Sequence, residues 1–357
     1  MNRFFKLILT TFLLIGALAV PLNSVAAEKS QLEVHFINVD QGDSSLVICD
    51  GEAMLIDGGK PGFSDLIYSY LKSHSINRLK CIVNTHPESD HIGGLSGALN
   101  YASVDMAFCP TTSYDSDAFR NFTKYLKKQN VSITVPKPGD YFYLGKAKVT
   151  VIAPISRTDD TNNNSIVLRI EHGDNSFLFT GDAETIEEND ILSSKTNIKS
   201  TVLKVGHHGS SSSTSDDFLE AVSPQYAVIS VGEENSYGHP TADTLNKLNK
   251  NKVSLYRTDI FGTIVCTSDG KGVSFSVEKN SKSDPYVIPE NPKSRAESTT
   301  TSPANNSSYV LNTNTKKFHY PYCSSVLDMK EKNKKVSTES RESIISKGYK
   351  PCGRCNP

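Results

Sequence analysis

The feature that most constrains this chain is a short loop at residues 84–94, which is rich in metal-binding side chains. It follows an apolar run at residues 79–84 with the length and composition of a buried strand. The loop then supplies four side chains that can bind a metal, His86, Glu88, Asp90 and His91. Imidazoles and carboxylates at this density suit Zn²⁺ or Mn²⁺. The loop therefore predicts a metal site at a strand end. The alternative is a polar surface loop that happens to hold two histidines.

Other polar groups follow later apolar runs. Residues 176–180, 200–205 and 225–231 have the pattern of strands. They are followed by Asp182, by the pair His207 and His208, and by His239. Side chains just beyond strand ends are exposed on one rim of a sheet, while the strands hold them rigidly. We therefore expect these groups to share a rim with the loop at residues 84–94.

Strands and helices are interspersed through both halves of this region. Further strands are expected near residues 33–39, 45–49, 53–56, 104–109, 131–135, 148–153 and 166–171 and near Val277, and helices near residues 64–74, 95–101 and 116–129. Two strand-rich halves with interspersed helices favour two packed sheets covered by helices. Four cysteines in these apolar runs are expected to be small buried side chains, and they are Cys49, Cys81, Cys109 and Cys266.

The order of these motifs resembles the metallo-β-lactamase superfamily. Within it, the chain is most similar to the hydrolase domain of the competence DNA-uptake proteins of the ComEC/Rec2 type. The matching segments are residues 39–44, 55–59, 85–94, 163–165, 179–182, 203–210 and 237–240. The resemblance covers residues 31–278 and implies an αββα sandwich with the metal site on one rim.

The resemblance also implies roles for individual residues. The implied metal ligands are His86, Glu88, Asp90, His91, Asp182 and one of His207 and His208. We favour His208, with His207 beside it or touching substrate. Asp182 is the implied bridge if two metals bind.

Two departures from the family pattern concern the first metal position. Glu88 stands where many members have histidine, and this makes the position harder and richer in oxygen. Asn164 and Ser165 stand where another histidine ligand is common, so we assign them a supporting role. The site is therefore expected to hold one tight metal or to prefer Mn²⁺.

A divalent ion in such a site promotes hydrolysis, because it lowers the pKa of a bound water toward 7 and screens the charge of a phosphate ester. Asp90 can orient the water as well as bind metal. His239 lies on a Gly-His-Pro turn and is expected to contact phosphate or to protonate the leaving group, the alternative being an ordinary loop histidine. His207 is a third catalytic candidate. Asp57, at the end of a strand, is expected to brace the histidine loop.

The first 27 residues have the pattern of a secretory signal peptide, with Arg3 and Lys6, an apolar stretch at residues 7–20 and small residues up to Ala27. The alternative is a membrane anchor, but the apolar stretch is shorter than the roughly 20 residues of a spanning helix. The expected location is therefore extracellular. Residues 28–280 would then form the hydrolase domain.

The C-terminal region reads as a separate small module. Residues 281–308 are rich in Ser, Thr, Pro, Asn and Lys and are expected to be a disordered linker. Residues 309–357 follow, with a four-ligand set suited to a tetrahedral structural Zn²⁺, namely His319, Cys323, Cys352 and Cys355. A segment this small builds little core, and a metal would supply the missing stability. The alternative is a disulfide between two of the three cysteines.

Residues 318–323 and 348–355 resemble the zinc-binding module of the Ada DNA-repair protein, in which a fourth cysteine replaces His319. The module carries a net charge of +6, whereas residues 28–308 sum to −9. A basic module favours a polyanion partner, either DNA or anionic cell wall.

The sequence thus predicts a secreted metal-dependent hydrolase, in particular a phosphodiesterase or nuclease acting on extracellular DNA. The alternatives are hydrolysis of another phosphodiester of the phosphocholine type, of a lactone or of a β-lactam, and a non-catalytic protein that binds DNA or cell wall.

Overall fold

The structure is a computed structural model. It describes residues 30–287 except 234, and residues 309–352 except 321, 322, 328 and 340. The predicted signal peptide, residues 288–308 of the predicted linker, and Cys355 lie outside the described residues.

The first sheet has eight strands in the order β15-β14-β1-β2-β3-β4-β5-β6. The strands are β1 (Leu32–Phe36), β2 (Ser45–Cys49), β3 (Glu52–Ile56), β4 (Arg78–Val83), β5 (Ser103–Phe108), β6 (Ile133–Thr134), β14 (Ile264–Ser268) and β15 (Val273–Val277). Strands β3 to β6 run parallel to one another, so their carboxyl ends meet at one rim. The loop at residues 84–94 follows β4 at this rim.

The second sheet has seven strands in the order β13-β12-β11-β10-β9-β8-β7. They are β7 (Tyr141–Leu144), β8 (Ala147–Ala153), β9 (Val167–His172), β10 (Asn175–Phe179), β11 (Val202–Lys204), β12 (Tyr226–Ile229) and β13 (Ser254–Arg257). Strands β10 to β13 are parallel, so the segments after β10, β11 and β12 also emerge at a common rim.

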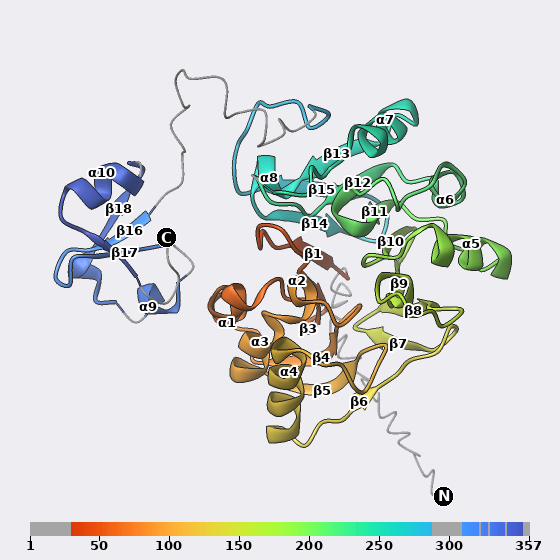
Figure 1. Ribbon diagram of the computed structural model, residues 1–357, viewed down its shortest axis with the longest axis horizontal. Helices are drawn as coiled ribbons and strands as arrows, with labels where there is room; N and C mark the ends of the chain where they lie inside the picture. The colour runs from red at the N-terminus through yellow and green to blue at the C-terminus, as the bar shows by residue number, and fades with distance from the viewer. Residues whose placement is uncertain are drawn as a thin grey trace, which may run out of the picture.

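The two sheets pack face to face, and helices cover their outer faces (Figure 1). Helices α1 (Ser64–Ser73), α3 (Leu95–Tyr101) and α4 (Asp117–Lys128) cover the first sheet, and α5 (Thr185–Ser194), α6 (Asp216–Val222) and α7 (Ala242–Lys250) cover the second. Short turns of helix are α2 (Ser89–Ile92), α8 (Thr258–Phe261), η1 (Pro61–Phe63), η2 (Asn162–Asn164) and η3 (Gly206–Gly209). The predicted αββα sandwich is confirmed.

Three apolar layers hold the sandwich together. The layer between the sheets includes Phe36, Val149 and Phe179, and the two outer layers lie between each sheet and its helices. Burial of apolar area at about 25 cal/mol per Å² makes these layers the main stabilising contribution. The thiols of Cys49, Cys81, Cys109 and Cys266 are buried, as expected. The rim residues are thus carried by a scaffold built independently of them.

The local pattern explains which helices were predictable. In α4 the side chain of Ser116 accepts a hydrogen bond from the backbone N–H of Phe119, and Phe119, Phe122 and Leu126 form a buried stripe. Helix α5 lacks such a stripe, because its buried positions include Glu187 and Glu188. Helices α5, α6 and α7 were all missed from the sequence.

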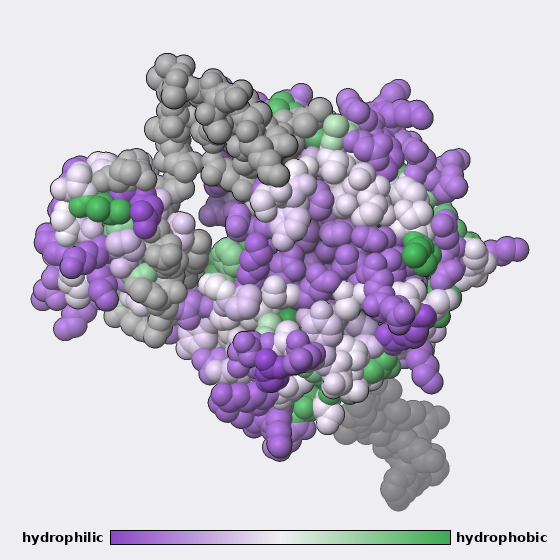
Figure 2. Space-filling view, viewed as in Figure 1, coloured by the Kyte–Doolittle hydropathy of each residue, from purple (hydrophilic) through white to green (hydrophobic). Residues whose placement is uncertain are grey.

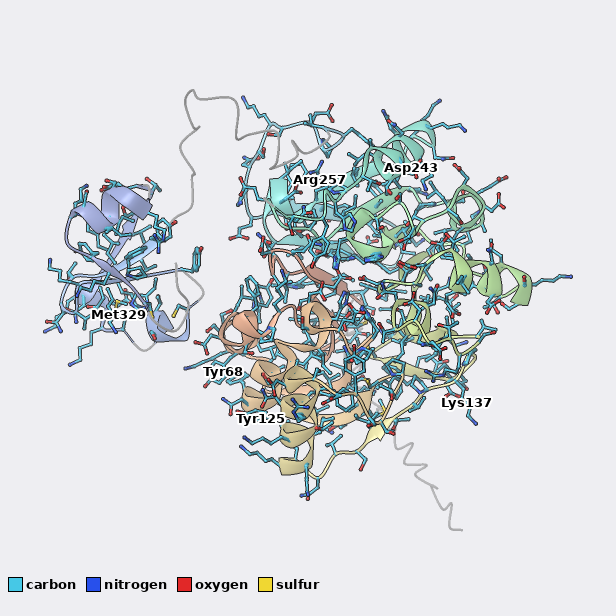
Figure 3. The ribbon with its side chains drawn as sticks, in the orientation of Figure 1. Tyr68, Tyr125, Lys137, Asp243, Arg257 and Met329 are labelled. Carbon is cyan, nitrogen blue, oxygen red and sulfur yellow. The ribbon has the colours of Figure 1, made fainter. Side chains whose placement is uncertain are left out.

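The body extends beyond the predicted domain boundary. Arg257, labelled in Figure 3, donates to the backbone carbonyls of Pro285 and Val287 at 3.0 and 2.6 Å. The hydroxyl of Tyr286 donates to the carbonyl of Val253. Residues 281–287, which the sequence assigned to the linker, are therefore held against the second half of the body.

The C-terminal module has a sheet of its own, in the order β18-β16-β17-β19. Its elements are β16 (Tyr309–Asn312), β17 (Lys317–His319), α9 (Ser324–Leu327), η5 (Glu331–Asn333), β18 (Lys334–Ser337), α10 (Arg341–Ser346) and β19 (Lys350–Pro351). One of its two small apolar clusters contains Cys323 and Cys352 together with Val310, Val326 and Met329. Two of the predicted metal ligands, Cys323 and Cys352, are thus part of this core.

Within the described ranges, no helix is long and apolar enough to cross a membrane. The face of the body seen in Figure 2 is largely hydrophilic, with apolar residues scattered over it.

Candidate metal centre

Three chain segments bring acidic and imidazole side chains together at one rim. The loop after β4 supplies His86, Asp90 and His91, the segment after β10 supplies Asp182, and η3 after β11 supplies His208. In overlapping groups of three, the ligand atoms of these residues lie within 4.8 Å of one another. The sequence-distant residues predicted to share a rim therefore meet in space.

Asp182 is at the centre of this arrangement. One of its carboxylate oxygens lies 3.3 Å from Nε2 of His91, and the other lies 4.0 Å from Nε2 of His86 and 3.5 Å from Nε2 of His208. Asp90 also approaches the cluster, with a carboxylate oxygen 3.5 Å from Nε2 of His208. Asp182 is therefore the carboxylate that all three imidazoles share.

The two neighbouring histidines of η3 point in different directions. Both have positive φ angles, 48° for His207 and 53° for His208, a region that non-glycine residues rarely occupy. His208 is buried within the cluster, whereas the His207 side chain is 23% exposed and its Nδ1 lies 3.1 Å from Glu184. Nε2 of His207 is 3.7 Å from Asp182. His208 belongs to two of the close groups of ligand atoms, whereas His207 belongs to none of them.

The cluster contains buried polar atoms with no partner. Among the described residues, Nε2 of His86, His91 and His208 and Oδ1 of Asp182 make no hydrogen bond although they are inaccessible to solvent. Buried polar groups are normally satisfied, because leaving one unpaired costs about 1–3 kcal/mol. Imidazole nitrogens and carboxylate oxygens converging without partners are the donor set of a divalent cation such as Zn²⁺ or Mn²⁺. These residues therefore fit a metal.

The buried carboxylates and imidazoles of the cluster have strongly shifted pKa values. Burial alone would raise the pKa of Asp182, but the imidazoles of His91 and His208 hold it well below its usual value. Burial alone would lower the pKa of His208, but Asp182 and Asp43 raise it to about 10. Burial and the neighbouring His91 lower the pKa of His86 to about 3. In the metal-free cluster Asp182 is thus anionic, His208 is protonated and His86 is neutral, so a bound cation would displace the proton of His208.

Asp57 lies behind the histidine loop. Its carboxylate accepts hydrogen bonds from the backbone N–H and the hydroxyl of Thr85, at 2.8 and 2.6 Å. The same carboxylate lies 2.8 Å from Nδ1 of His91, on the side of the ring opposite the cluster. A carboxylate in this position orients the ring and raises its basicity as a ligand.

Three predicted residues lie at the margin of the cluster. Glu88 belongs to none of the close groups, and its carboxylate accepts from the hydroxyl of Thr161 at 2.5 Å. Ser165 accepts from the backbone N–H of Asp182 at 3.1 Å and lies 3.5 Å from Nδ1 of His86. Asn164 holds the preceding loop through Thr158 and Asp160. Ser165 thus supports two cluster residues directly, whereas Asn164 acts on the loop alone.

Sequence reasoning missed Asp43 and Lys204. Asp43 belongs to a close group with Asp182 and His208, and its Oδ1 lies 3.2 Å from Nδ1 of His208. Its other oxygen pairs at 2.8 Å with Nζ of Lys204, and both side chains are buried. Burial would raise the pKa of Asp43, but Lys204 and His208 lower it to about 2. The sequence offered one signal: Lys204 is a charged residue that directly follows the apolar residues Val202 and Leu203 of β11.

His239 lies at the edge of the centre. Its ring meets that of His207 edge-on, with centroids 5.6 Å apart, and its Nδ1 is buried with no partner among the described residues. Burial, together with His207 and His208, lowers the pKa of His239 to about 4. The ring is therefore neutral near pH 7 and has one N–H to donate.

Comparison with known proteins agrees with this geometry. The sequence pattern of the metallo-beta-lactamase superfamily matches residues 37–233, so the chain belongs to that superfamily of metal-dependent hydrolases. The fold implies divalent metal ions.

Curated relatives include the ComE operon protein 3 of Bacillus subtilis (strain 168), which is 30% identical over 70% of this chain and 34% of the relative. The competence protein ComA of Neisseria gonorrhoeae is also 30% identical, over 67% of this chain and 33% of the relative. This chain thus spans about a third of the length of these relatives. Among solved structures, the metallo-beta-lactamase fold protein YhfI of Bacillus subtilis aligns with a TM-score of 0.42 and 13% identity, over 63% of this chain and 95% of YhfI.

A second group of candidate ligands lies in the C-terminal module. His319, Cys323 and Cys352 are buried, and their ligand atoms lie within 4.8 Å of one another. The backbone N–H of Cys352 donates to the carbonyl of Phe318 at 2.9 Å, which places β19 beside β17. Nδ1 of His319 is buried and makes no hydrogen bond with any residue that the structure describes. Three of the four predicted zinc ligands thus come together in the described part of the module.

Proposed function

We propose that this protein is a secreted metal-dependent phosphodiesterase that hydrolyses nucleic acid. The observation that carries the proposal is the cluster around Asp182, with a partly exposed His207 and an unpaired His239 at its open edge. A divalent metal held by His86, Asp90, His91, Asp182 and His208, with Glu88 as a further candidate, would activate water at neutral pH.

The residues at the edge of the cluster have separate tasks. Asp90 is the carboxylate nearest to solvent among the cluster members, with its side chain 20% exposed, so it can accept a proton from the attacking water. His207 and His239 can donate ring N–H groups to phosphate oxygens. Because His239 is neutral, it acts as a hydrogen-bond donor in this proposal. Asp57 and Ser165 keep the ligands in place.

Two further observations favour nucleic acid as the substrate. Relatives of this chain are named for competence and for recombination, including recombination protein 2 of Haemophilus influenzae. The C-terminal module carries a net +6, against −9 for residues 28–308. In this proposal the module binds one structural Zn²⁺ through His319, Cys323, Cys352 and Cys355 and supplies most of the attraction to phosphates. Residues 1–27 direct export.

Hydrolysis assays with Zn²⁺ or Mn²⁺ on DNA, a small aryl phosphodiester, a phosphocholine ester, a lactone and a β-lactam test the proposal. We expect cleavage of DNA and of the aryl phosphodiester, and a loss of more than about a hundredfold in Asp90→Ala. Asp243→Ala is the matched control, because Asp243 is an exposed carboxylate on α7 paired with Lys247. Preference for the lactone or β-lactam, or full activity in Asp90→Ala, would reject the proposal.

A further inference from the structure

An exposed aromatic ring stands beside the metal centre. Tyr237 is 64% exposed, and its ring stacks on that of His239 with centroids 5.8 Å apart and an angle of 26° between the planes. His239 in turn contacts His207, whose Nε2 lies 3.7 Å from Asp182. The three rings therefore form a continuous series from the surface to the buried carboxylate.

The loop that carries Tyr237 is held firmly. The side chain of Asn235 accepts from the backbone N–H of His239 at 3.0 Å and donates to its carbonyl at 2.6 Å. Pro240 packs on Gly209, where an added Cβ would lie 2.6 Å from Cβ of Pro240. The backbone N–H of Thr241 donates to the carbonyl of Gly209 at 2.9 Å. Because η3 also carries His207 and His208, these contacts hold His239 in place beside the cluster, and Tyr237 stacks on His239.

Folding alone explains neither Tyr237 nor His239. A ring that is 64% exposed contributes little apolar burial to stability. His239 is only 9% exposed, yet its Nδ1 has no hydrogen-bond partner among the described residues. Buried nitrogens are normally paired, so this one points to a ligand. An exposed aromatic ring beside an imidazole with an unpaired nitrogen suits a ligand that has a flat apolar face next to an anionic group.

We propose that Tyr237 and His239 form a stacking subsite for an unpaired nucleobase beside the phosphate that is cleaved. This inference rests on the proposed nuclease function and specifies its substrate as single-stranded nucleic acid or frayed ends. Aromatic side chains stack on any base, because every base has a π-face. In a duplex these faces are covered by neighbouring bases, so Tyr237 favours strands whose bases are exposed. Tyr237 is a specificity residue here, whereas His239 also contacts the phosphate.

The test uses the full chain with Zn²⁺ present and Asp90→Ala as the common background, so that binding is measured with little cleavage while the C-terminal module keeps its metal. The probe is a short single-stranded oligonucleotide containing a fluorescent adenine analogue that is quenched by stacking. In this background we expect Tyr237→Ala to weaken binding about tenfold and to lose the quenching, and Tyr237→Phe to keep both. Tyr143→Ala is the matched control, because Tyr143 is 53% exposed on the edge strand β7. With Asp90 intact, Tyr237→Ala should raise KM for single strands more than it lowers kcat.

The outcomes separate this inference from the proposed function. If the wild type cleaves DNA but Tyr237→Ala binds and quenches like the wild type, the stacking subsite is wrong and the nuclease function stands. If quenching depends on Tyr237 but no nucleic acid is cleaved, the subsite stands and the nuclease function is wrong. Equal binding of the blunt duplex formed from the same strand would overturn the preference for unpaired bases.

Discussion

The two groups of candidate metal ligands differ in how they relate to the apolar core. The body cluster lies on the rim of a sandwich that is built on three large apolar layers. In the described part of the module, Cys323 and Cys352 belong to a small apolar cluster with Val310, Val326 and Met329. The body's donors are nitrogen and oxygen, whereas the module's described donors are one imidazole and two sulfurs.

This difference indicates that a metal can have two separate roles in one chain, one in the reaction and one in folding. Where the scaffold is already packed, the metal serves the reaction and its removal leaves the fold. Where the ligands are themselves the core, metal binding free energy becomes folding free energy. Three experiments can break or sharpen this contrast.

The largest effect is expected from metal removal. Structural zinc contributes about 10–16 kcal/mol in small zinc-binding peptides, so a chelator should unfold the module. Hydrogen exchange should show residues 309–352 losing protection, including the amide of Cys352, while strands β1 to β5 keep theirs. Re-addition of Zn²⁺ is the control and should restore protection. Loss of protection in both parts would show that the body scaffold also depends on metal.

A smaller effect is expected from the buried pair of Asp43 and Lys204. Removing one partner of a buried ion pair leaves an uncompensated charge, so Lys204→Met should lower the free energy of unfolding by about 3–5 kcal/mol. Chemical denaturation measures this loss, and the double variant Asp43→Asn with Lys204→Met should recover part of it. Arg78→Met is the control, because the Arg78 and Asp105 side chains are 70% and 39% exposed and water screens their pair.

If Lys204→Met costs no more than Arg78→Met, the buried pair does not stabilise the rim.

The smallest effect on the chain itself is expected from deleting residues 309–357. Because the module holds the excess positive charge, DNA affinity should fall about tenfold or more and lose much of its dependence on salt. Hydrolysis of the small aryl phosphodiester should be unchanged, since the metal centre lies wholly in the body. Binding is measured by fluorescence anisotropy over a range of salt concentrations. Unchanged DNA affinity would place the polyanion-binding surface on the body instead.

Prediction succeeded where a local pattern decides structure. The helix expected at residues 95–101 matches α3, and the strand expected at residues 45–49 matches β2. The relation to the metallo-β-lactamase superfamily and the αββα architecture were also predicted correctly. These successes follow from apolar periodicity and from motif order, both of which are properties of the chain alone.

Prediction from the sequence failed where charged residues are buried in the structure. Glu187, Glu188 and Lys204 are buried, and no periodicity rule expects charged side chains inside. Glu188 accepts from the backbone N–H groups of Thr214 and Ser215, a partnership that arises only when α5 and α6 meet. Asp43 was missed for the same reason, because its partners lie far along the chain.

The sequence alone determined which chemistry this protein can carry, because residue type and position after a strand are written in the chain. Its tertiary structure decided which of these groups act together. It turned His208 inward and left His207 partly exposed, drew Glu88 to Thr161, and stacked Tyr237 on His239. The physical reason is that such choices depend on contacts between segments tens to more than a hundred residues apart along the chain, or on the local backbone angles of a turn. Neither is encoded in a local pattern.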